Sequence, residues 1–411
     1  MRLLYSLSIS LYAVAIKIAA LTGNSKAKKW VSGRKNWASQ LQNINPNNKK
    51  TIWIHAASLG EFEQAMPVIE LLKKTEPNLF IVLSLFSPSG FEVKKNYATA
   101  DKVIYLPIDL RKNASLFLDL VNPQKAIFIK YEFWFNYLSE LKDRKIPSYL
   151  VSGIFRPSQH FFKSYGSWFR KKLGVFQHFF VQNEESQQLL STIGYKNSTV
   201  TGDTRLDRVI EISKAPFSDY RFESFSAKKK TIIFGSSWSA DNKLATQLSK
   251  TKLTYKIIIV PHEIHHEKIQ SLKAAFNSKV KLFSETKPNE DLSTENILII
   301  DQIGLLSKIY RYAYLSFIGG GFGSGIHNIL EAAVYGSPVI FGPNYQKFQE
   351  AKDLVKMNGG FSISSFDEFN RLLETLKDED TYLNSKMQAL EYVSKNKGAT
   401  KKVIQEILTS S

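Results

Sequence analysis

Apolar and polar positions divide the chain into one long apolar segment near its start and a regular alternation of short strands and helices after it. Residues 3–22 are mostly apolar and predict a single helix about as long as the hydrocarbon core of a membrane is thick. From residue 51 onward, short β-branched runs alternate with helical stretches, which is typical of parallel α/β sheets. The expected strands are TIWIH, LFIVLSL, KVIYL, AIFI, PSYLVS and HFFVQ in the first half, and TIIFG, KIIIV, VKLFS, ILIID, YLSFI and PVIF in the second.

This alternation predicts two α/β units, because 411 residues exceed one ordinary core. The segment 208–230, with Pro216 and a run of three lysines, is expected to link them. We therefore expect two Rossmann-like domains, the GT-B architecture of glycosyltransferases. The predicted parts are a membrane-anchoring helix at 1–22, an N-terminal acceptor domain at 23–210, a C-terminal nucleotide-sugar donor domain at 225–395 and a C-terminal helix at 396–411.

The charge of the chain is +18, and half of it precedes the first acidic residue, Glu61. The nine cations are Arg2, Lys17, Lys26, Lys28, Lys29, Arg34, Lys35, Lys49 and Lys50. Such a region can meet nucleic acid or an anionic membrane. The apolar segment favours a membrane surface over nucleic acid, and the basic residues after it place the protein body on the cytoplasmic side.

Lys17 lies within the apolar segment and leaves two arrangements open, a helix that spans the membrane and a helix that lies in its surface. A cleaved signal peptide is a third reading, and Lys17 and the lack of a clean cleavage site count against it. The chain has no cysteine and so needs no oxidising compartment.

Residues 317–343 (FIGGGFGSGIHNILEAAVYGSPVIFGP) combine an apolar strand, a glycine-rich turn and a predicted helix that starts near Ile326. A turn of this kind can bring bare backbone N–H groups close to a phosphate, and the helix adds its partial positive charge. A carboxylate at Glu331 could accept hydrogen bonds from a ribose. The glycines alone could equally serve tight turns and packing, but the whole pattern predicts a nucleotide-sugar site.

A second candidate site follows the first predicted strand, which ends near His55. A loop of small residues, 56–60, leads to a helix that begins near Glu61. A carboxylate at the start of a helix is stabilised in its charged form, which suits a base at neutral pH. An acidic first-turn residue without a chemical role is the alternative.

These motifs resemble the 3-deoxy-D-manno-octulosonic acid (Kdo) transferases that act on the lipid A precursor. The resemblance covers nearly the whole chain. It rests on the apolar N-terminal segment and on HAASLGE, SPSG (87–90), YLPIDL, YEFWFN, TGDTRLD, FGSS and GIHNILEAAVYGSPVIFGP in this order.

The resemblance implies an inverting transfer of Kdo from CMP-Kdo to a lipid A precursor at the cytoplasmic face of the inner membrane. It implies Glu61 as the catalytic base and Glu132 as a second essential carboxylate. Acceptor contacts are expected at Ser58, Gly60, Ser89 and Gly90. Donor contacts are expected at Ser236, Ser237, His262, Gly323, Gly325, Ile326, His327, Asn328 and Glu331. For the two serines, a helix cap is the alternative role.

Two positions depart from the family pattern. Lys130 replaces the first Glu of an ETELW-like motif, and His262 replaces an arginine close to the donor, in the simplest alignment. An arginine is always charged, whereas a histidine need not be.

We expect no metal and no redox cofactor. His265 and His266 are adjacent and would point about 100° apart on a helix, which disfavours a metal site. Asp378 and Asp380 are expected to be solvated capping acids. The alternatives to a Kdo transferase are another GT-B enzyme, such as a UDP-sugar transferase or a non-hydrolysing epimerase, and a non-catalytic nucleotide-sugar binding protein.

Overall fold

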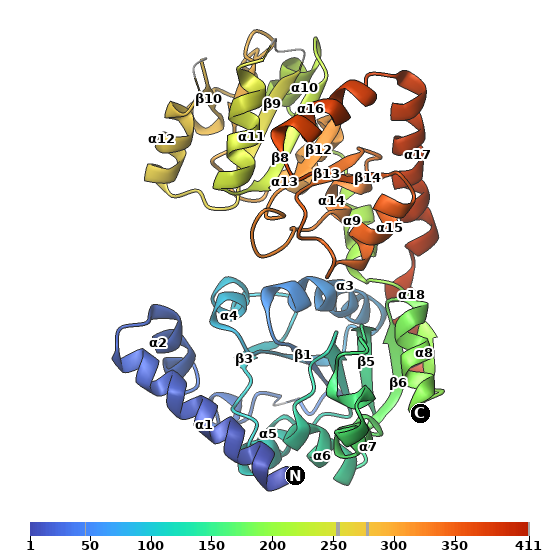
Figure 1. Ribbon diagram of the computed structural model, residues 1–411. Coiled ribbons are helices and arrows are strands. Elements are labelled where there is room, and N and C mark those ends of the chain that lie inside the picture. The colour runs from blue at the N-terminus through green and yellow to red at the C-terminus, as the bar shows by residue number, and fades with distance from the viewer. Residues whose placement is uncertain (46, 252–254, 277–278, 410–411) are drawn as a thin grey trace. The chain divides into compact units, whose positions relative to one another are not determined.

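The computed structural model describes residues 1–45, 47–251, 255–276 and 279–409. The chain divides into two compact units (Figure 1). Unit 1 comprises residues 1–207 and 398–411, and unit 2 comprises residues 208–397. Each unit is an α/β structure built on its own parallel sheet, so the predicted fold class is confirmed.

The sheet of unit 1 has seven strands in its described part, in the order β3-β2-β1-β4-β5-β6-β7. All neighbouring strands are parallel. Six of them were predicted, and the short edge strand β7 was not. The strands are β1 (Thr51–Ala56), β2 (Phe80–Leu85), β3 (Lys102–Tyr105), β4 (Lys125–Ile129), β5 (Ser148–Gly153), β6 (Phe176–Val181) and β7 (Ser198–Val200).

Helices cover both faces of this sheet, so its central strands are buried on both sides. Alternate residues of β1 show this, since Trp53 packs with α5 and α6 while Ile54 packs with α3 and α18. The helices of unit 1 are α1 (Arg2–Leu21), α2 (Ser25–Ser32), α3 (Leu59–Thr75), α4 (Pro88–Lys94), α5 (Arg111–Val121), α6 (Phe135–Asp143), α7 (Ser167–Leu173), α8 (Glu184–Thr192) and α18 (Ala399–Thr409).

The sheet of unit 2 also has seven strands in its described part, in the order β10-β11-β9-β8-β12-β13-β14. The edge strand β14 was not predicted. The strands are β8 (Thr231–Ser237), β9 (Lys256–Pro261), β10 (Lys281–Leu282), β11 (Ile297–Ile299), β12 (Leu315–Ile318), β13 (Val339–Phe341) and β14 (Gly360–Ser362). Its helices are α10 (Tyr220–Ser226), α11 (Ser239–Ser249), α12 (His266–Ala274), α13 (Leu306–Ile309), α14 (Leu330–Ala333), α15 (Gln349–Lys356), α16 (Phe366–Thr375) and α17 (Glu379–Asn396).

The segment expected as a linker is helical instead. It contains most of α9 (Arg205–Lys214) and all of α10, and from residue 208 it belongs to unit 2. Phe222 of α10 is fully buried and stacks on Phe283 at 5.0 Å, so packing of aromatic residues outweighs the local turn pattern.

The C-terminal segment returns to unit 1. The amides of Gly398 and Thr400 donate to the carboxylate of Asp207 at 2.5 and 2.6 Å, which fixes the start of α18. Val403, Ile404 and Ile407 of α18 then enter the core beside α3.

Among the described residues, α1 is the one helix long and apolar enough to cross a membrane by length and composition. Only Ala13 of this helix is buried.

Candidate functional site

In unit 1, β1 and β4 lie next to each other although two strands separate them along the chain. The sheet grows from β1 towards β2 on one side and from β4 towards β5 on the other. Ligands of open α/β sheets bind at such a switch point, outside the carboxyl ends of the strands. Glu61 follows β1 and Glu132 follows β4, so the fold places both predicted carboxylates at this point.

Glu61 lies in the first turn of α3 and is 5% exposed. Ser58 is the N-cap residue of α3, and its hydroxyl donates to Oε2 of Glu61. Ser58 therefore fixes the direction of this carboxylate within its own loop.

The loop before α3 packs against the SPSG turn that begins α4. The amides of Phe86 and Ser87 both donate to the carbonyl of Ala57, at 3.2 and 2.7 Å. A Cβ on Gly90 would lie 3.1 Å from the amide nitrogen of Leu59, so the glycine permits this close approach.

The other two expected acceptor residues are exposed. Gly60 has room for a side chain, since a Cβ there would be 3.8 Å from the Ser58 hydroxyl. The hydroxyl of Ser89 lies 3.3 Å from that of Ser87. Gly60 and Ser89 are therefore open to a ligand, whereas Gly90 has a packing role.

Glu132 is held beside a buried histidine and a tryptophan. The indole N–H of Trp134 donates to Nε2 of His55 at 2.8 Å, and Nδ1 of His55 lies 2.8 Å from the hydroxyl of Ser84. Because Nε2 accepts a hydrogen bond and burial lowers the pKa of His55 to about 3, His55 is neutral. Its 4.0 Å approach to Glu132 is therefore not an ion pair.

The protonation of Glu132 is set by its surroundings. Burial, and then the charge of Glu61, raises the pKa of Glu132 to about 8, although a hydrogen bond from Trp134 opposes this shift. Glu132 is consequently mostly neutral at pH 7, and it can donate a hydrogen bond. A carboxyl group that is kept neutral in this way can act as a hydrogen-bond donor during a reaction.

This shift predicts a pH-dependent stability. Between pH 4.5 and about 8, folded Glu132 keeps a proton that the unfolded chain loses, so the parent protein loses stability as the pH rises through this window. Glu132→Gln removes the effect. We expect the melting temperature of the variant, relative to the parent, to rise from pH 5 to pH 8 in thermal unfolding. An identical difference at both pH values would contradict the raised pKa.

The departure at Lys130 adds a positive charge close to this pair. Lys130 has a left-handed backbone (φ 69°), and its amide donates to the carbonyl of Val151 at 2.8 Å. Its ammonium lies 5.1 Å from the ring centre of Tyr131, and its charge lowers the pKa of Glu132 slightly against the larger upward causes.

Unit 2 has a matching switch point between β8 and β12, which are neighbours in the sheet. Ser236 and Ser237 are the last two residues of β8, the loop after β8 begins at Trp238, and the loop after β12 carries the glycine-rich turn. Asp241 joins the two loops, because its Oδ2 accepts from the amides of Trp238 at 2.8 Å and Gly320 at 3.0 Å. A Cβ on Gly319 would lie 2.3 Å from the carbonyl oxygen of Ser236.

The helix expected to start at Ile326 begins at Leu330 and is only four residues long, so that prediction was wrong. The turn closes on itself instead. The amides of Gly323 and Gly325 donate to the carbonyl of Gly320 at 2.9 and 3.3 Å, and the amide of His327 donates to that of Gly319 at 3.1 Å. These three amides are therefore engaged within the turn, and no long helix adds its dipole to a phosphate site.

Gly325 is required by the fold itself. It has a φ of +140°, and a Cβ there would lie 2.8 Å from the ring of Phe348. Gly323 is exposed, and a Cβ there would meet nothing closer than 3.5 Å. Ile326 is buried at 4% exposure, so its side chain is part of the core.

Three aromatic side chains form a stack at this switch point. His262 stacks on His327 with ring centres 4.3 Å apart, and Trp238 stacks on His262 at 4.7 Å. The indole N–H of Trp238 donates to Nε2 of His327 at 2.8 Å. Burial lowers the pKa of both histidines, that of His327 to about 4. At the position where the family pattern has an arginine, this chain thus presents a neutral, stacked ring.

The remaining predicted donor residues lie at the end of β8, after β12 and in α14. Ser236 has a left-handed backbone (φ 50°), and Ser237 is 2% exposed with no hydrogen-bond partner for its hydroxyl among the described residues. The side-chain amide of Asn328 donates to Oε1 of Glu331 at 3.2 Å. Ser237 and Trp238 also line a cavity of about 490 Å³ between α11 and α12.

Comparison with known proteins shows a similarity to Kdo transferases. Residues 35–208 match the family model of the 3-deoxy-D-manno-octulosonic-acid transferase (kdotransferase). A Kdo transferase of Rickettsia bellii is 29% identical over 432 aligned positions, which cover 99% of this chain and 98% of that protein. The chain is therefore similar to Kdo transferases over almost its whole length. A Kdo transferase of Aquifex aeolicus is 27% identical and covers 80% of this chain and 87% of its own length.

Other similarities are more partial. The chain spans 55% of the length of a bifunctional glycosyltransferase/methyltransferase of Fusobacterium nucleatum, which is 26% identical over 353 residues and covers 82% of this chain. The solved structure of the UDP-GlcNAc 2-epimerase of Neisseria meningitidis bound to UDP-GlcNAc has a TM-score of 0.61. It covers 88% of this chain and 100% of its own at 15% identity, so this likeness concerns the fold.

Sequence reasoning missed His55, Trp134, Trp238 and Asp241. Trp134 and Trp238 stand inside or directly after motifs that were noticed, YEFWFN and FGSS, but no local pattern indicates that each indole bonds an imidazole from a distant part of the chain.

Two further sequence interpretations concern metals. Asp378 is the N-cap of α17 and accepts from the amide of Thr381 at 2.9 Å, which confirms its capping role, and Asp380 is exposed. Among the described residues no group of three or more His, Asp or Glu side chains is placed to hold a metal ion.

Proposed function

We propose that the protein is a Kdo transferase, which moves Kdo from CMP-Kdo to a lipid A precursor with inversion. The observation that carries the proposal is the pair of carboxyl groups at the switch point of unit 1, where Glu132 is held neutral by burial and by the charge of Glu61. An inverting transfer needs a single base and no covalent intermediate.

In the proposed reaction, Glu61 accepts the proton of the attacking acceptor hydroxyl. The acceptor oxygen forms a bond to the anomeric carbon of Kdo while the bond from that carbon to the phosphate oxygen breaks, and CMP leaves with the electron pair. Glu132 donates a hydrogen bond to a substrate oxygen and leaves the role of base to Glu61. Ser58 orients Glu61, and Gly60, Ser89 and Gly90 belong to the loops proposed to face the acceptor.

The donor is assigned to unit 2. Glu331 is proposed to accept from the ribose hydroxyls, and Ser236, Ser237 and Asn328 to donate to phosphate oxygens. The stack of Trp238, His262 and His327 offers neutral ring N–H groups and a flat apolar surface. The loop from Gly323 to Ile326 is proposed to border the donor, with Gly323 at its open side and Gly325 shaping the turn. No metal or other cofactor is assigned.

Calorimetry tests the donor assignment. The parent protein should bind CMP more tightly than UMP, and Glu331→Ala should weaken CMP binding by roughly 10- to 100-fold, the usual value of a hydrogen bond to a charged group. Glu379→Ala removes an exposed carboxylate of the same unit and serves as the matched control, which should bind CMP like the parent. Equal or tighter binding of UMP by the parent would favour a UDP-sugar enzyme.

The alternatives are less well supported. Epimerases share the fold at 12–15% identity, whereas the relatives at 26–29% identity are named as transferases. A non-catalytic binding protein would not need a carboxyl group that is held neutral at the switch point of unit 1. We place the protein at the cytoplasmic face of the inner membrane, because nine cations accompany the apolar N-terminal segment.

A further inference from the structure

One side of α1 forms an apolar stripe that nothing in unit 1 covers. Its residues recur every three or four positions, so they share one face of the helix. Each has more than half of its surface exposed: Leu3, Leu4, Leu7, Leu11, Val14, Ile18 and Leu21. Lys17 lies outside the stripe, about 100° around the helix from Ile18. An exposed apolar face of this size marks an interaction surface.

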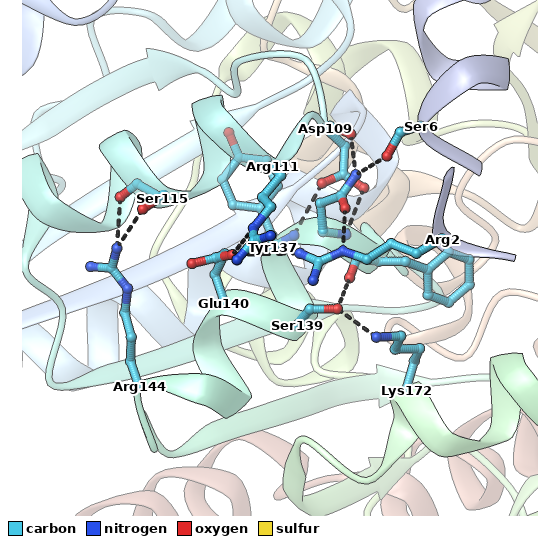
Figure 2. Close-up of polar contacts among 12 residues, drawn as sticks. Arg2, Ser6, Asp109, Arg111, Ser115, Tyr137, Ser139, Glu140, Arg144 and Lys172 are labelled. Carbon is cyan, nitrogen blue, oxygen red and sulfur yellow. Dashed lines mark hydrogen bonds and ion pairs between the residues drawn. The ribbon is translucent and has the colours of Figure 1, made fainter. Parts of the chain in front are cut away.

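The opposite side of α1 is bonded to unit 1 at the first turns (Figure 2). The guanidinium of Arg2 donates to Oδ1 of Asn136 at 3.1 Å and to Oε1 of Glu140 at 3.4 Å. The hydroxyl of Tyr5 donates to Oδ2 of Asp109 at 2.6 Å. Asp109 is completely buried, and burial raises its pKa to about 6, so removing Tyr5 would leave a buried carboxyl group without one of its donors.

The second half of α1 is held by α2, which follows it directly. The ring of Tyr12 packs on Trp30 of α2 at 6.1 Å and stacks on Phe86 at 6.5 Å. Figure 1 shows α1 and α2 side by side at the edge of unit 1. A helix with its first turns and its middle fixed to the same globular unit lies along that unit, and crossing a bilayer would break both sets of contacts.

A basic pocket opens at the first turn of α1. This cavity, the Arg2 pocket, measures about 220 Å³ and is lined by Arg2, Leu138, Ser139, Lys142, Asp143, Trp168, Lys171 and Lys172. Its lining contains four cations and one carboxylate. The ammonium of Lys172 donates to the hydroxyl of Ser139 at 2.6 Å and lies 5.4 Å from the ring centre of Trp168.

The positive charges of the pocket repel one another. Burial lowers the pKa of Lys172, and the charges of Arg2 and Lys142 lower it further. An anion in the pocket would relieve this repulsion. The volume corresponds to roughly seven water molecules, which is room for a phosphate group with its ester oxygens. Trp168, at the rim, is the residue type enriched where protein meets the headgroup layer.

We propose that α1 lies in the plane of an anionic membrane, with its apolar stripe among the acyl chains and the Arg2 pocket holding the phosphate of a phospholipid headgroup. The occupant follows from the charge of the pocket, whose lining has four cations and one carboxylate, and from its place at the first turn of the helix that carries the stripe. The proposal does not rest on the transferase assignment, since membrane binding is measured without donor or acceptor.

Depth measurements test the in-plane arrangement. The chain has no cysteine, so single labels can be placed through Leu4→Cys, Leu11→Cys and Ile18→Cys on the exposed stripe. With an environment-sensitive label and vesicles of phosphatidylcholine and phosphatidylglycerol, we expect all three labels at one shallow depth, about 5–10 Å into the headgroup and acyl boundary. A label at Leu11→Cys near the bilayer centre, with the other two nearer opposite surfaces, would show a spanning helix and overturn the proposal.

Vesicle flotation tests the pocket. The double variant Lys142→Gln, Lys171→Gln should bind vesicles that contain phosphatidylglycerol more weakly, by about fivefold for each lysine removed. The double variant Lys74→Gln, Lys196→Gln removes two exposed lysines elsewhere on unit 1 and should bind like the parent. Equal losses of vesicle binding in both double variants would show that net charge alone causes the effect, and would overturn the assignment of the pocket.

A separate experiment distinguishes a lipid phosphate from free inorganic phosphate. In calorimetry without vesicles, we expect the parent protein to bind inorganic phosphate no better than the variant Lys142→Gln, Lys171→Gln does. Tighter binding by the parent than by this variant would assign the pocket to a free phosphate and overturn the lipid assignment.

Discussion

Glu61→Gln should lower the turnover of CMP-Kdo and acceptor by about 10² to 10⁴-fold, the usual value of a positioned general base. Glutamine keeps the size of the side chain and can still contact Ser58, but it cannot accept the proton of the attacking hydroxyl. The loss should appear in kcat, because the substrates are held by other residues.

The same preparation should bind CMP like the parent in calorimetry, since the donor is assigned to unit 2. Glu63→Gln, two residues further along α3, is the matched control and should turn over like the parent. A folded Glu61→Gln protein with near-parent turnover would remove Glu61 from the mechanism and make Glu132 the next candidate base.

Glu132 should respond differently to the two substitutions that remove its carboxyl group. Glu132→Ala removes a hydrogen-bond donor and should lower turnover by about 10² to 10³-fold, as the loss of one donor to a developing charge does. Glu132→Gln keeps an N–H donor at the same place, so most of the activity should remain. In the parent, activity should fall as the pH rises through about 8, where Glu132 loses its proton, and the Gln variant should lack this fall.

This comparison separates a donor from a base. If Glu132→Gln were as inactive as Glu132→Ala at every pH, Glu132 would have to exchange a proton during the reaction. If both variants were fully active, Glu132 would have no part in it.

The sheets could be predicted from sequence because their strands are buried on both faces. Runs such as LFIVLSL and KIIIV are apolar at nearly every position, and this pattern predicts a central parallel strand without knowledge of its neighbours. The two strands that were not predicted, β7 and β14, have three residues each and lie at sheet edges, where fewer apolar positions are needed.

The site was less predictable, because local patterns do not contain strand order. Glu61 and Glu132 were found through motifs, but their meeting at one switch point depends on β1 pairing with β4. The glycine-rich turn also depends on contacts that a local pattern does not contain. Its glycines were taken as bare amides for a phosphate, yet Gly319 and Gly325 are needed for close packing and for a positive φ, respectively.

The neutral state of Glu132 could not be read from the sequence either. It arises from burial and from the charge of Glu61, and both depend on tertiary contacts. The place of Lys17 could not be read from the sequence either. In the sequence it looks like a defect in a membrane span, but in the docked helix it lies beside the apolar stripe.

The most direct measurement is a transfer assay with the purified full chain, CMP-Kdo and a lipid A precursor in detergent, scored by product mass and by CMP release. We expect the acceptor to gain the mass of Kdo, with one CMP released for each Kdo added, and we expect Glu61→Gln to abolish nearly all of both signals. CMP release without a heavier acceptor, or no turnover of CMP-Kdo by a folded parent that does turn over a UDP-sugar, would contradict the assignment.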